Sequence, residues 1–138
     1  MKKIIIIGAS SGMGMRVATD FARLGWRVGI AARREDRLKE IKGLYPDRVE
    51  YMAIDVEAED AVERFYKLIE LIDGMDYLLY AAGCGWRNPD LDEALDARTV
   101  GVNVLGFTKI INAAYKYFRQ TANVTRGHIC AITSVAGT

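Results

Sequence analysis

The 138-residue sequence has few of the features that mark specialised classes of protein. It has two cysteines, Cys84 and Cys130, and a single histidine, so we predict neither a disulfide framework nor a metal site. Lys and Arg number 19 against 18 for Asp and Glu, and the net charge of +1 gives no basic field to attract nucleic acid. With two prolines and 51% hydrophobic residues, the composition is that of a globular domain rather than a disordered chain.

Long hydrophobic runs are also missing. The apolar run of residues 4–9 is far too short to cross a bilayer. Gly8, Ser10 and Ser11 interrupt it before the apolar region of a signal peptide forms. We therefore expect a protein without membrane association and, from the low cysteine content, a cytoplasmic one.

Short apolar runs alternate with longer amphipathic stretches along the whole chain. The runs predict strands at 3–7, 26–31, 48–54, 76–81 and 127–133. The stretches predict helices at 12–24, 35–44, 58–72 and 91 to about 119. One side of the last helix is expected to carry Val100, Val104, Phe107, Ile111 and Tyr115. This alternation predicts a doubly wound α/β fold with a parallel sheet, whose ligands bind beyond the carboxyl ends of the strands.

A glycine-rich loop joins the first predicted strand to the first helix. Its sequence is Gly8-Ala9-Ser10-Ser11-Gly12-Met13-Gly14, with the spacing G-x-x-x-G-x-G. Glycines at such a position allow a tight turn and a close approach of a pyrophosphate to the backbone amides at the helix start. The alternative is a plain strand-to-helix turn that happens to contain three glycines.

The ordered set of motifs resembles the short-chain dehydrogenase/reductase superfamily. Besides the glycine loop, the segments 80–83 (Tyr-Ala-Ala-Gly), 103–106 (Asn-Val-Leu-Gly) and 132–137 (Ile-Thr-Ser-Val-Ala-Gly) are similar to family motifs in the family's order. The sequence departs from the family at Ile7, usually Thr, and at Tyr80 and Ala81, usually Asn. The resemblance covers all 138 residues and implies a Rossmann fold with strand order 3-2-1-4-5.

The end of the second predicted strand bears on the choice of nicotinamide cofactor. An acidic residue there would bind the adenosine ribose of NAD, but the sequence continues Ala32-Arg33-Arg34. Guanidinium groups suit the 2′-phosphate of NADP, so NADP is expected and NAD is the less favoured cofactor. Alternatively, these arginines and Arg37 form a solvated face interleaved with acidic residues.

Further cofactor-binding residues are expected at other strand ends. The resemblance implies that Asp55, which Val56 follows, holds the adenine amino group. As an alternative, or in addition, Asp55 caps the helix predicted from residue 58. Ala81, Ala82 and Gly83 offer small surfaces against which a ribose can lie. The full expected cofactor set is Gly8, Ser10, Ser11, Gly12, Met13, Gly14, Arg33, Arg34, Asp55, Val56, Ala81, Ala82 and Gly83.

Catalytic residues are implied by the resemblance alone. Ser134 matches the residue that holds the substrate oxygen, and Asn103 matches one that supports a water chain to a catalytic Lys. A Tyr-x-x-x-Lys pair is expected about a dozen residues after Ser134, but the sequence given ends at Thr138. The structural alternatives are that Ser134 satisfies backbone groups at a strand end and that Asn103 marks a helix kink beside Gly101 and Gly106.

These observations predict the cofactor-binding half of an NADP-dependent oxidoreductase acting on a small carbonyl or alcohol, in a homo-oligomer. Residues 1–138 are expected to form one NAD(P)-binding domain, incomplete at its C-terminus and inactive by itself. The competing hypotheses are a non-catalytic nucleotide-binding or sensor module of the same fold, and a doubly wound domain without a dinucleotide role.

Overall fold

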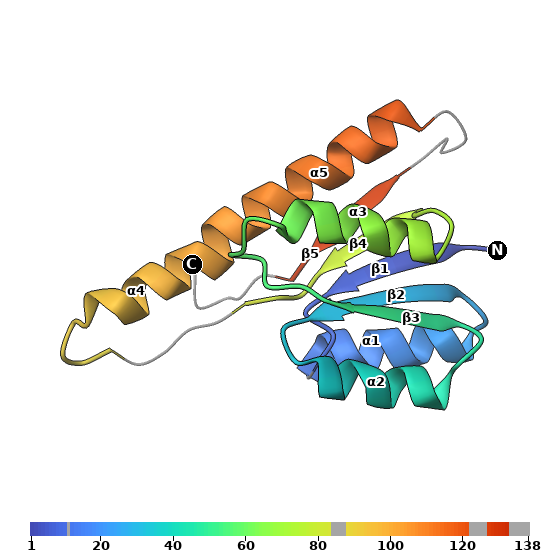
Figure 1. Cartoon of the computed structure of the whole chain (residues 1–138), viewed down its shortest axis with the longest axis horizontal. Helices are drawn as coiled ribbons and strands as arrows, with labels where there is room; N and C mark the ends of the chain where they lie inside the picture. Colours follow the sequence, from blue (N-terminus) through green and yellow to red (C-terminus); the bar gives the residue numbers. More distant parts are fainter. Residues whose placement is uncertain (11, 84–87, 122–126, 133–138) are drawn as a thin grey trace.

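The computed structural model describes residues 1–10, 12–83, 88–121 and 127–132. Their elements form a five-stranded sheet with helices on both faces (Figure 1). The strands are β1 (Lys3–Ile7), β2 (Arg27–Ala32), β3 (Val49–Ala53), β4 (Tyr77–Tyr80) and β5 (His128–Ala131). The helical elements are α1 (Gly12–Arg23), α2 (Glu35–Leu44), α3 (Ala61–Leu71), α4 (Glu93–Val100), the π-helical turn η1 (Gly101–Gly106) and α5 (Phe107–Gln120).

The sheet confirms the predicted topology. Its strand order is β3-β2-β1-β4-β5, and every neighbouring pair is parallel. In β1, Ile6 lies opposite Ile30 of β2 and Leu79 of β4, and these three apolar side chains share one face of the sheet. The parallel arrangement brings all five carboxyl ends to one edge, where the loops after β1, β2, β3 and β4 meet.

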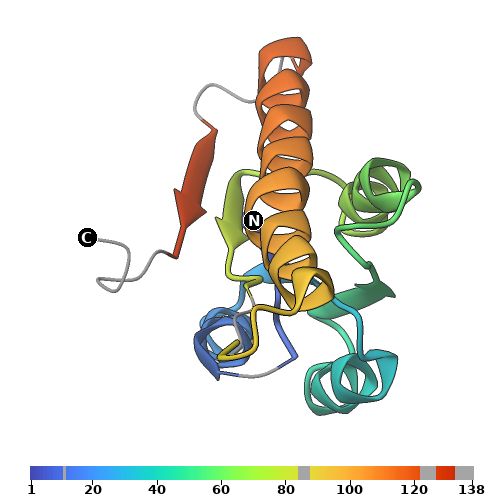
Figure 2. The same cartoon turned by 90° about the vertical axis from the view of Figure 1, so that its left-hand side faces the viewer.

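Two hydrophobic cores follow from the alternation of side chains along β1. Ile5 and Ile7 pack with Phe65 of α3 and Ile110 of α5, whereas Ile4 and Ile6 pack with α1 and α2 through residues such as Leu38. Figure 2 shows α3 and α5 on one side of the sheet and α1 and α2 on the other. A strand that feeds two cores must be apolar at successive positions, and this explains the run of four isoleucines.

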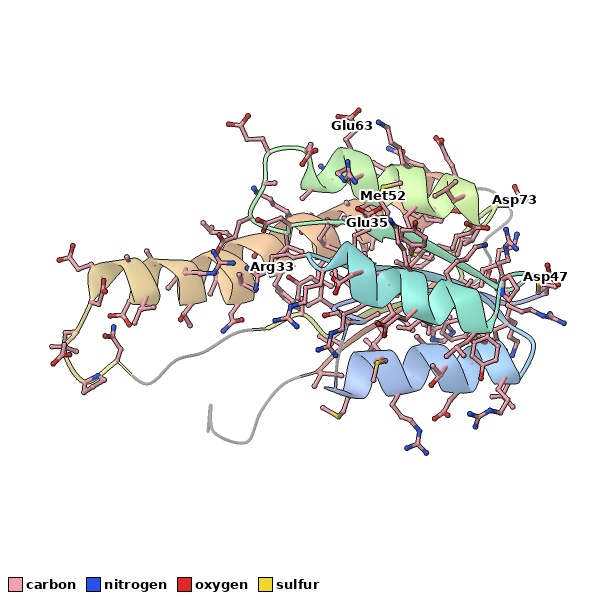
Figure 3. The ribbon with its side chains drawn as sticks, turned by 60° about the horizontal axis from the view of Figure 1, so that its bottom comes forward. Arg33, Glu35, Asp47, Met52, Glu63 and Asp73 are labelled. Atoms are coloured by element: carbon pink, nitrogen blue, oxygen red, sulfur yellow. The ribbon has the colours of Figure 1, made fainter. Side chains whose placement is uncertain are left out.

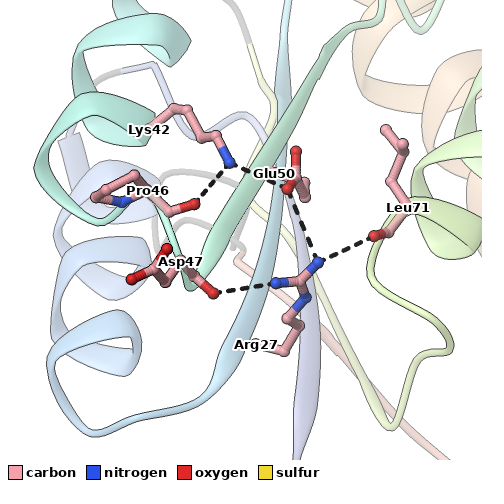
Figure 4. A network of polar contacts seen from close by, with 6 residues as sticks. All are labelled: Arg27, Lys42, Pro46, Asp47, Glu50 and Leu71. Atoms are coloured by element: carbon pink, nitrogen blue, oxygen red, sulfur yellow. Dashed lines mark hydrogen bonds and ion pairs between the residues drawn. The ribbon is translucent and has the colours of Figure 1, made fainter.

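A polar network joins the amino ends of β2 and β3 to the neighbouring helices (Figure 4). The Arg27 guanidinium donates to the carbonyl oxygens of Asp47 at 3.0 Å and Leu71 at 3.2 Å. Glu50 pairs with Arg27 at 3.8 Å and with Lys42 at 3.0 Å. The network therefore connects α2, β2, β3 and the end of α3, at the end of the sheet opposite the predicted site.

The helix predicted from residue 58 begins three residues later. The chain after Asp55 first makes two tight turns, in which Ala58 N donates to Asp55 O at 2.9 Å and Ala61 N donates to Ala58 O at 3.2 Å. Asp60 is the residue that precedes α3. The prediction that Asp55 caps this helix is therefore wrong, because the turns already use the backbone groups that a continuous helix would need.

The long helical stretch also differs from the prediction. It is divided into α4, η1 and α5, and its buried residues are Val102, Gly106, Ile110, Ala113 and Ala114. Val100, Val104 and Tyr115, expected on one apolar side, are 51%, 52% and 60% exposed. The π-helical turn shifts the register, and the buried face combines the small residues Gly106, Ala113 and Ala114 with Val102 and Ile110. Phe107 and Ile111, expected on the same side, are partly buried against the core, so the expectation holds for these two residues and is wrong for the other three.

Candidate functional site

The candidate site is a pocket of about 340 Å³ at the carboxyl edge of the sheet. It is bounded by the loops after β1, β2, β3 and β4 and by the helical turn η1. Its lining residues are Ile7, Gly8, Ser10, Ala32, Arg33, Arg34, Ile54, Asp55, Val56, Ala81, Ala82, Gly83 and Val102. The structure thus brings together predicted residues from four separate strand ends. This is the position at which doubly wound sheets bind ligands.

Gly8 joins the first loop closely to the end of β4. Its φ is +93°, a conformation that favours glycine. A β-carbon at this position would lie 2.7 Å from Ala81 C and from Ala82 Cα, and closer still to Ala82 N. The Gly8 amide donates to Ala31 O at 2.7 Å, and Ala81 N donates to Ile7 O at 2.7 Å. The floor of the pocket is therefore built from tightly packed backbone of β1, β2 and β4.

The other glycines of the loop have different surroundings. A β-carbon on Gly14 would collide with Gly8 O, so this glycine allows α1 to pack against the loop. At Gly12, with φ of +62°, no atom of the described residues lies within 4 Å of the position of a β-carbon. Gly12 and Met13 are exposed and Gly14 is buried, and none of the three lines the pocket. Ser11 lies outside the described residues. One side of Gly12 is thus open to a ligand.

Arg33 and Arg34 bring two positive charges to the pocket. Both are exposed and immediately follow β2, whose last residue is Ala32. Neither forms an ion pair with any residue in the described part of the chain, whereas nearby Glu35 pairs with Lys39 at 3.9 Å. Figure 3 shows Arg33 well away from Asp47 and Asp73, which lie at the other end of the strands, while α4 extends beyond Arg33. The pocket therefore has a cationic rim without a carboxylate at the end of β2.

Asp55 and Val56 form the adjacent wall of the pocket. Oδ1 of the Asp55 carboxylate accepts a hydrogen bond from the Glu57 backbone amide at 3.0 Å. The turn after β3 thus orients the Asp55 side chain. Arg64 of α3 donates to Ala53 O at 2.7 Å and holds the end of β3 next to this turn. Asp55 is exposed, and Val56 is buried with 6% of its surface accessible. An exposed carboxylate above an apolar floor can accept a hydrogen bond from the amino group of a flat ring.

Ala81, Ala82 and Gly83 form the wall that continues from β4. All three residues line the pocket and carry little or no side chain, and the contact of a ribose with them stays a prediction. Asn103 of η1 lies beside this wall, since a β-carbon on Gly83 would be 3.5 Å from Asn103 Oδ1. Asn103 is exposed but does not line the pocket. Ser134, the second predicted catalytic residue, lies outside the described residues.

Three of the lining residues, Ile7, Ile54 and Val102, were not predicted from the sequence. Ile7 and Ile54 end or follow apolar strands, a pattern that indicates core residues and gives no sign of a ligand. Val102 enters the pocket from η1, and only the register of the π-helical turn places it there. The neighbouring glycines, Gly101 and Gly106, were the one available signal for an irregular helix.

The described residues contain neither a candidate membrane span nor a candidate metal site. No helix there is both long enough and apolar enough to cross a membrane. No group of three or more His, Cys, Asp and Glu side chains in that part of the chain is placed to hold a metal ion.

Comparisons with known proteins match the whole chain to one family of enzymes. A family model described as short chain dehydrogenase matches residues 2–138. The chain is 32% identical to an uncharacterized oxidoreductase of Mycobacterium tuberculosis, over 99% of this chain and 56% of that protein. It spans about half the length of the curated relatives that it matches.

Solved structures of short chain dehydrogenases and related reductases share the fold of this chain. The alcohol dehydrogenase from Thermococcus sibiricus, complexed with 5-hydroxy-NADP, is 30% identical with a TM-score of 0.83, covering 97% of this chain and 58% of that one. The 3-ketoacyl-(acyl-carrier-protein) reductase from Brucella melitensis, complexed with NADH, is 28% identical with a TM-score of 0.80, covering 86% and 50%. Together with the strand order and the pocket at the carboxyl edge, these matches show that the chain belongs to the short chain dehydrogenase family.

Proposed function

We propose that the protein is an NADP-dependent oxidoreductase that transfers a hydride between nicotinamide and a carbonyl or alcohol substrate. Residues 1–138 would be its cofactor-binding domain, with the proton donor supplied by another part of the enzyme. The observation that carries the cofactor preference is the pair Arg33 and Arg34, exposed on the rim of a pocket that has Ala32 at the end of β2.

The residues of the pocket fit an adenine dinucleotide in distinct ways. Asp55 can accept the adenine amino group, and the apolar floor of Val56 and Ile54 can lie against the ring. The open side of Gly12 and the start of α1 offer backbone amides and a positive dipole end to the pyrophosphate. These features support binding of the adenosine half at β2 and β3 and of the pyrophosphate at α1.

The preference for NADP follows from charge. A guanidinium group donates two parallel hydrogen bonds to a phosphate, and such charge-assisted bonds contribute about 1.5–3 kcal/mol each. Because neither Arg33 nor Arg34 has an ion-pair partner among the described residues, no existing bond must be broken when a 2′-phosphate binds. A carboxylate in place of Ala32 would repel that phosphate, and none is present.

The reacting end is proposed from the place of Asn103 beside Gly83. A bound nicotinamide cofactor supplies or accepts the hydride in such an enzyme. Asn103 would support a water chain that delivers the proton, and Ser134 would hold the substrate oxygen. We further propose that the enzyme is a cytoplasmic homo-oligomer that acts on small molecules rather than nucleic acids or membranes, and that residues 1–138 are inactive by themselves.

The test is a calorimetric titration with 2′-phospho-ADP-ribose and with ADP-ribose. We expect the phosphorylated ligand to bind at least about tenfold more tightly, because one charge-assisted bond accounts for that ratio. Arg33→Ala should remove most of the difference. Arg37→Ala is the matched control, since Arg37 is equally exposed on α2 and does not line the pocket.

Equal affinities, or tighter binding of ADP-ribose, would refute the preference for NADP. Binding of neither ligand would refute the dinucleotide site itself and favour a doubly wound domain of another function. If the intact protein binds NADPH but oxidises it with no member of a panel of aldehydes and ketones, the non-catalytic sensor hypothesis is favoured.

A further inference from the structure

The π-helical turn η1 is an irregular segment at the edge of the site. It spans Gly101–Gly106 between two regular helices and carries Asn103. A π-helical turn is rare and occurs frequently at functional sites. Such a segment needs contacts from outside the helix to hold its register.

The loop after β3 supports both ends of this turn. A β-carbon on Gly106 would lie 2.6 Å from Val56 Cγ2, and one on Gly101 would collide with the Glu57 carboxylate. The backbone of η1 is therefore in direct contact with two residues that follow Asp55. These contacts limit movement of the turn toward the pocket but leave its rotation about the helix axis unspecified.

Tyr80 supplies a directional contact. Its hydroxyl donates to Val102 O at 3.3 Å in a buried hydrogen bond that joins β4 to η1. Tyr80 is 3% exposed, and its ring packs edge-on against Phe107 at 5.2 Å between centroids. The ring therefore has little freedom to move, and the hydroxyl fixes the carbonyl of the residue that immediately precedes Asn103.

The same strand end also fixes what Asn103 faces. Gly83, beside Asn103 Oδ1, follows Tyr80 by three residues in the segment after β4. We infer that Tyr80 is a positioning residue: by holding Val102 O, its hydroxyl sets the orientation of Asn103 relative to the reacting end of the pocket. This inference rests on the proposed function for the role of Asn103, but the hydrogen bond and its effect on η1 can be tested independently.

The chain contains a matched control for the loss of the hydroxyl. Tyr66 of α3 also donates its hydroxyl to a carbonyl of the long helix, at 3.1 Å to Ala113 O in α5. Tyr80→Phe and Tyr66→Phe thus each delete one oxygen and one hydrogen bond to the same helix, the first at η1 and the second about three turns away.

Hydrogen exchange of the intact protein tests the anchor without cofactor or substrate. Tyr80→Phe should accelerate exchange of the amides of residues 101–107 by about five- to tenfold, the effect of losing one hydrogen bond. Tyr66→Phe should leave those amides unchanged and accelerate only those near Ala113. Equal or absent acceleration at 101–107 in the two variants overturns the anchor.

Kinetics of the intact enzyme test the positioning role. Tyr80→Phe should lower kcat about five- to tenfold with the KM for NADPH unchanged, and should have no further effect in an Asn103→Ala background. Additive effects of the two substitutions overturn the inference, as does a loss equal to that of Tyr66→Phe. If Asn103→Ala itself leaves kcat unchanged, the proposed role of Asn103 fails, while the exchange experiment still decides whether Tyr80 anchors η1.

Discussion

Gly8→Ala tests the packing on which the pocket is built. An alanine with φ near +93° departs from the allowed regions of L-residues, and this costs about 1–2 kcal/mol. The new methyl group would also lie 2.7 Å from Ala81 C and Ala82 Cα, which are backbone atoms and cannot rotate away. Overpacking of this kind costs about 1–3 kcal/mol, so the expected total loss in the free energy of unfolding is about 2–5 kcal/mol.

Urea unfolding monitored by tryptophan fluorescence measures the loss. Trp26 packs against Phe21 at 4.4 Å and Tyr77 at 5.1 Å between ring centroids, so its emission reports on core packing. The midpoint should fall while the m-value stays unchanged, because the substitution alters the folded loop rather than the surface exposed on unfolding.

Gly43→Ala is the control with the opposite sign. Gly43 lies within α2, and no atom of the described residues is within 4 Å of its β-carbon position. Alanine there should raise the free energy of unfolding by about 0.5–1 kcal/mol through helix propensity. A Gly8→Ala protein within about 1 kcal/mol of the parent would refute the close approach of the first loop to β4.

Two further substitutions test the network and the adenine wall. Arg27→Met should lower the free energy of unfolding by about 1–2 kcal/mol, because it removes two hydrogen bonds to carbonyl oxygens. The control Arg16→Met removes only an exposed ion pair with Asp20 and should lower it by less than about 0.5 kcal/mol. Equal losses of the two variants in urea unfolding would contradict the role of the network. Asp55→Ala should weaken ADP-ribose and 2′-phospho-ADP-ribose alike, by about tenfold in calorimetry, and an effect confined to the phosphorylated ligand would contradict adenine recognition.

The strands were predictable because parallel strands carry a strong local signal. A strand buried on both faces must be apolar at every position, and the isoleucines of β1 satisfy that condition visibly in the sequence. The bounds of β1 are those predicted, and no other strand boundary moved by more than two residues. Since the pocket is built from strand ends, the positions of Arg33, Asp55 and Ala82 on its walls could be anticipated as well.

The long helix was less predictable because three of its five buried residues have small side chains. Gly106, Ala113 and Ala114 lie against the core, and a search for large apolar residues passes over them. The π-helical turn further displaces the helical period that such a search assumes. Val102 therefore appeared neither as a core residue nor as a pocket residue, although the structure makes it both.

The glycines of the first loop divide into those that the fold requires and one that it leaves open. Gly8 and Gly14 are needed for packing, since a β-carbon on either would collide with backbone atoms, and they would be required in this loop with or without a ligand. Gly12 needs its positive φ, yet one of its sides meets no described atom within 4 Å. Arg33 and Arg34 likewise make no ion pair within the described part of the chain. The case for a phosphate-bearing ligand therefore rests on Gly12 and the two arginines, whose exposed groups the fold itself does not use.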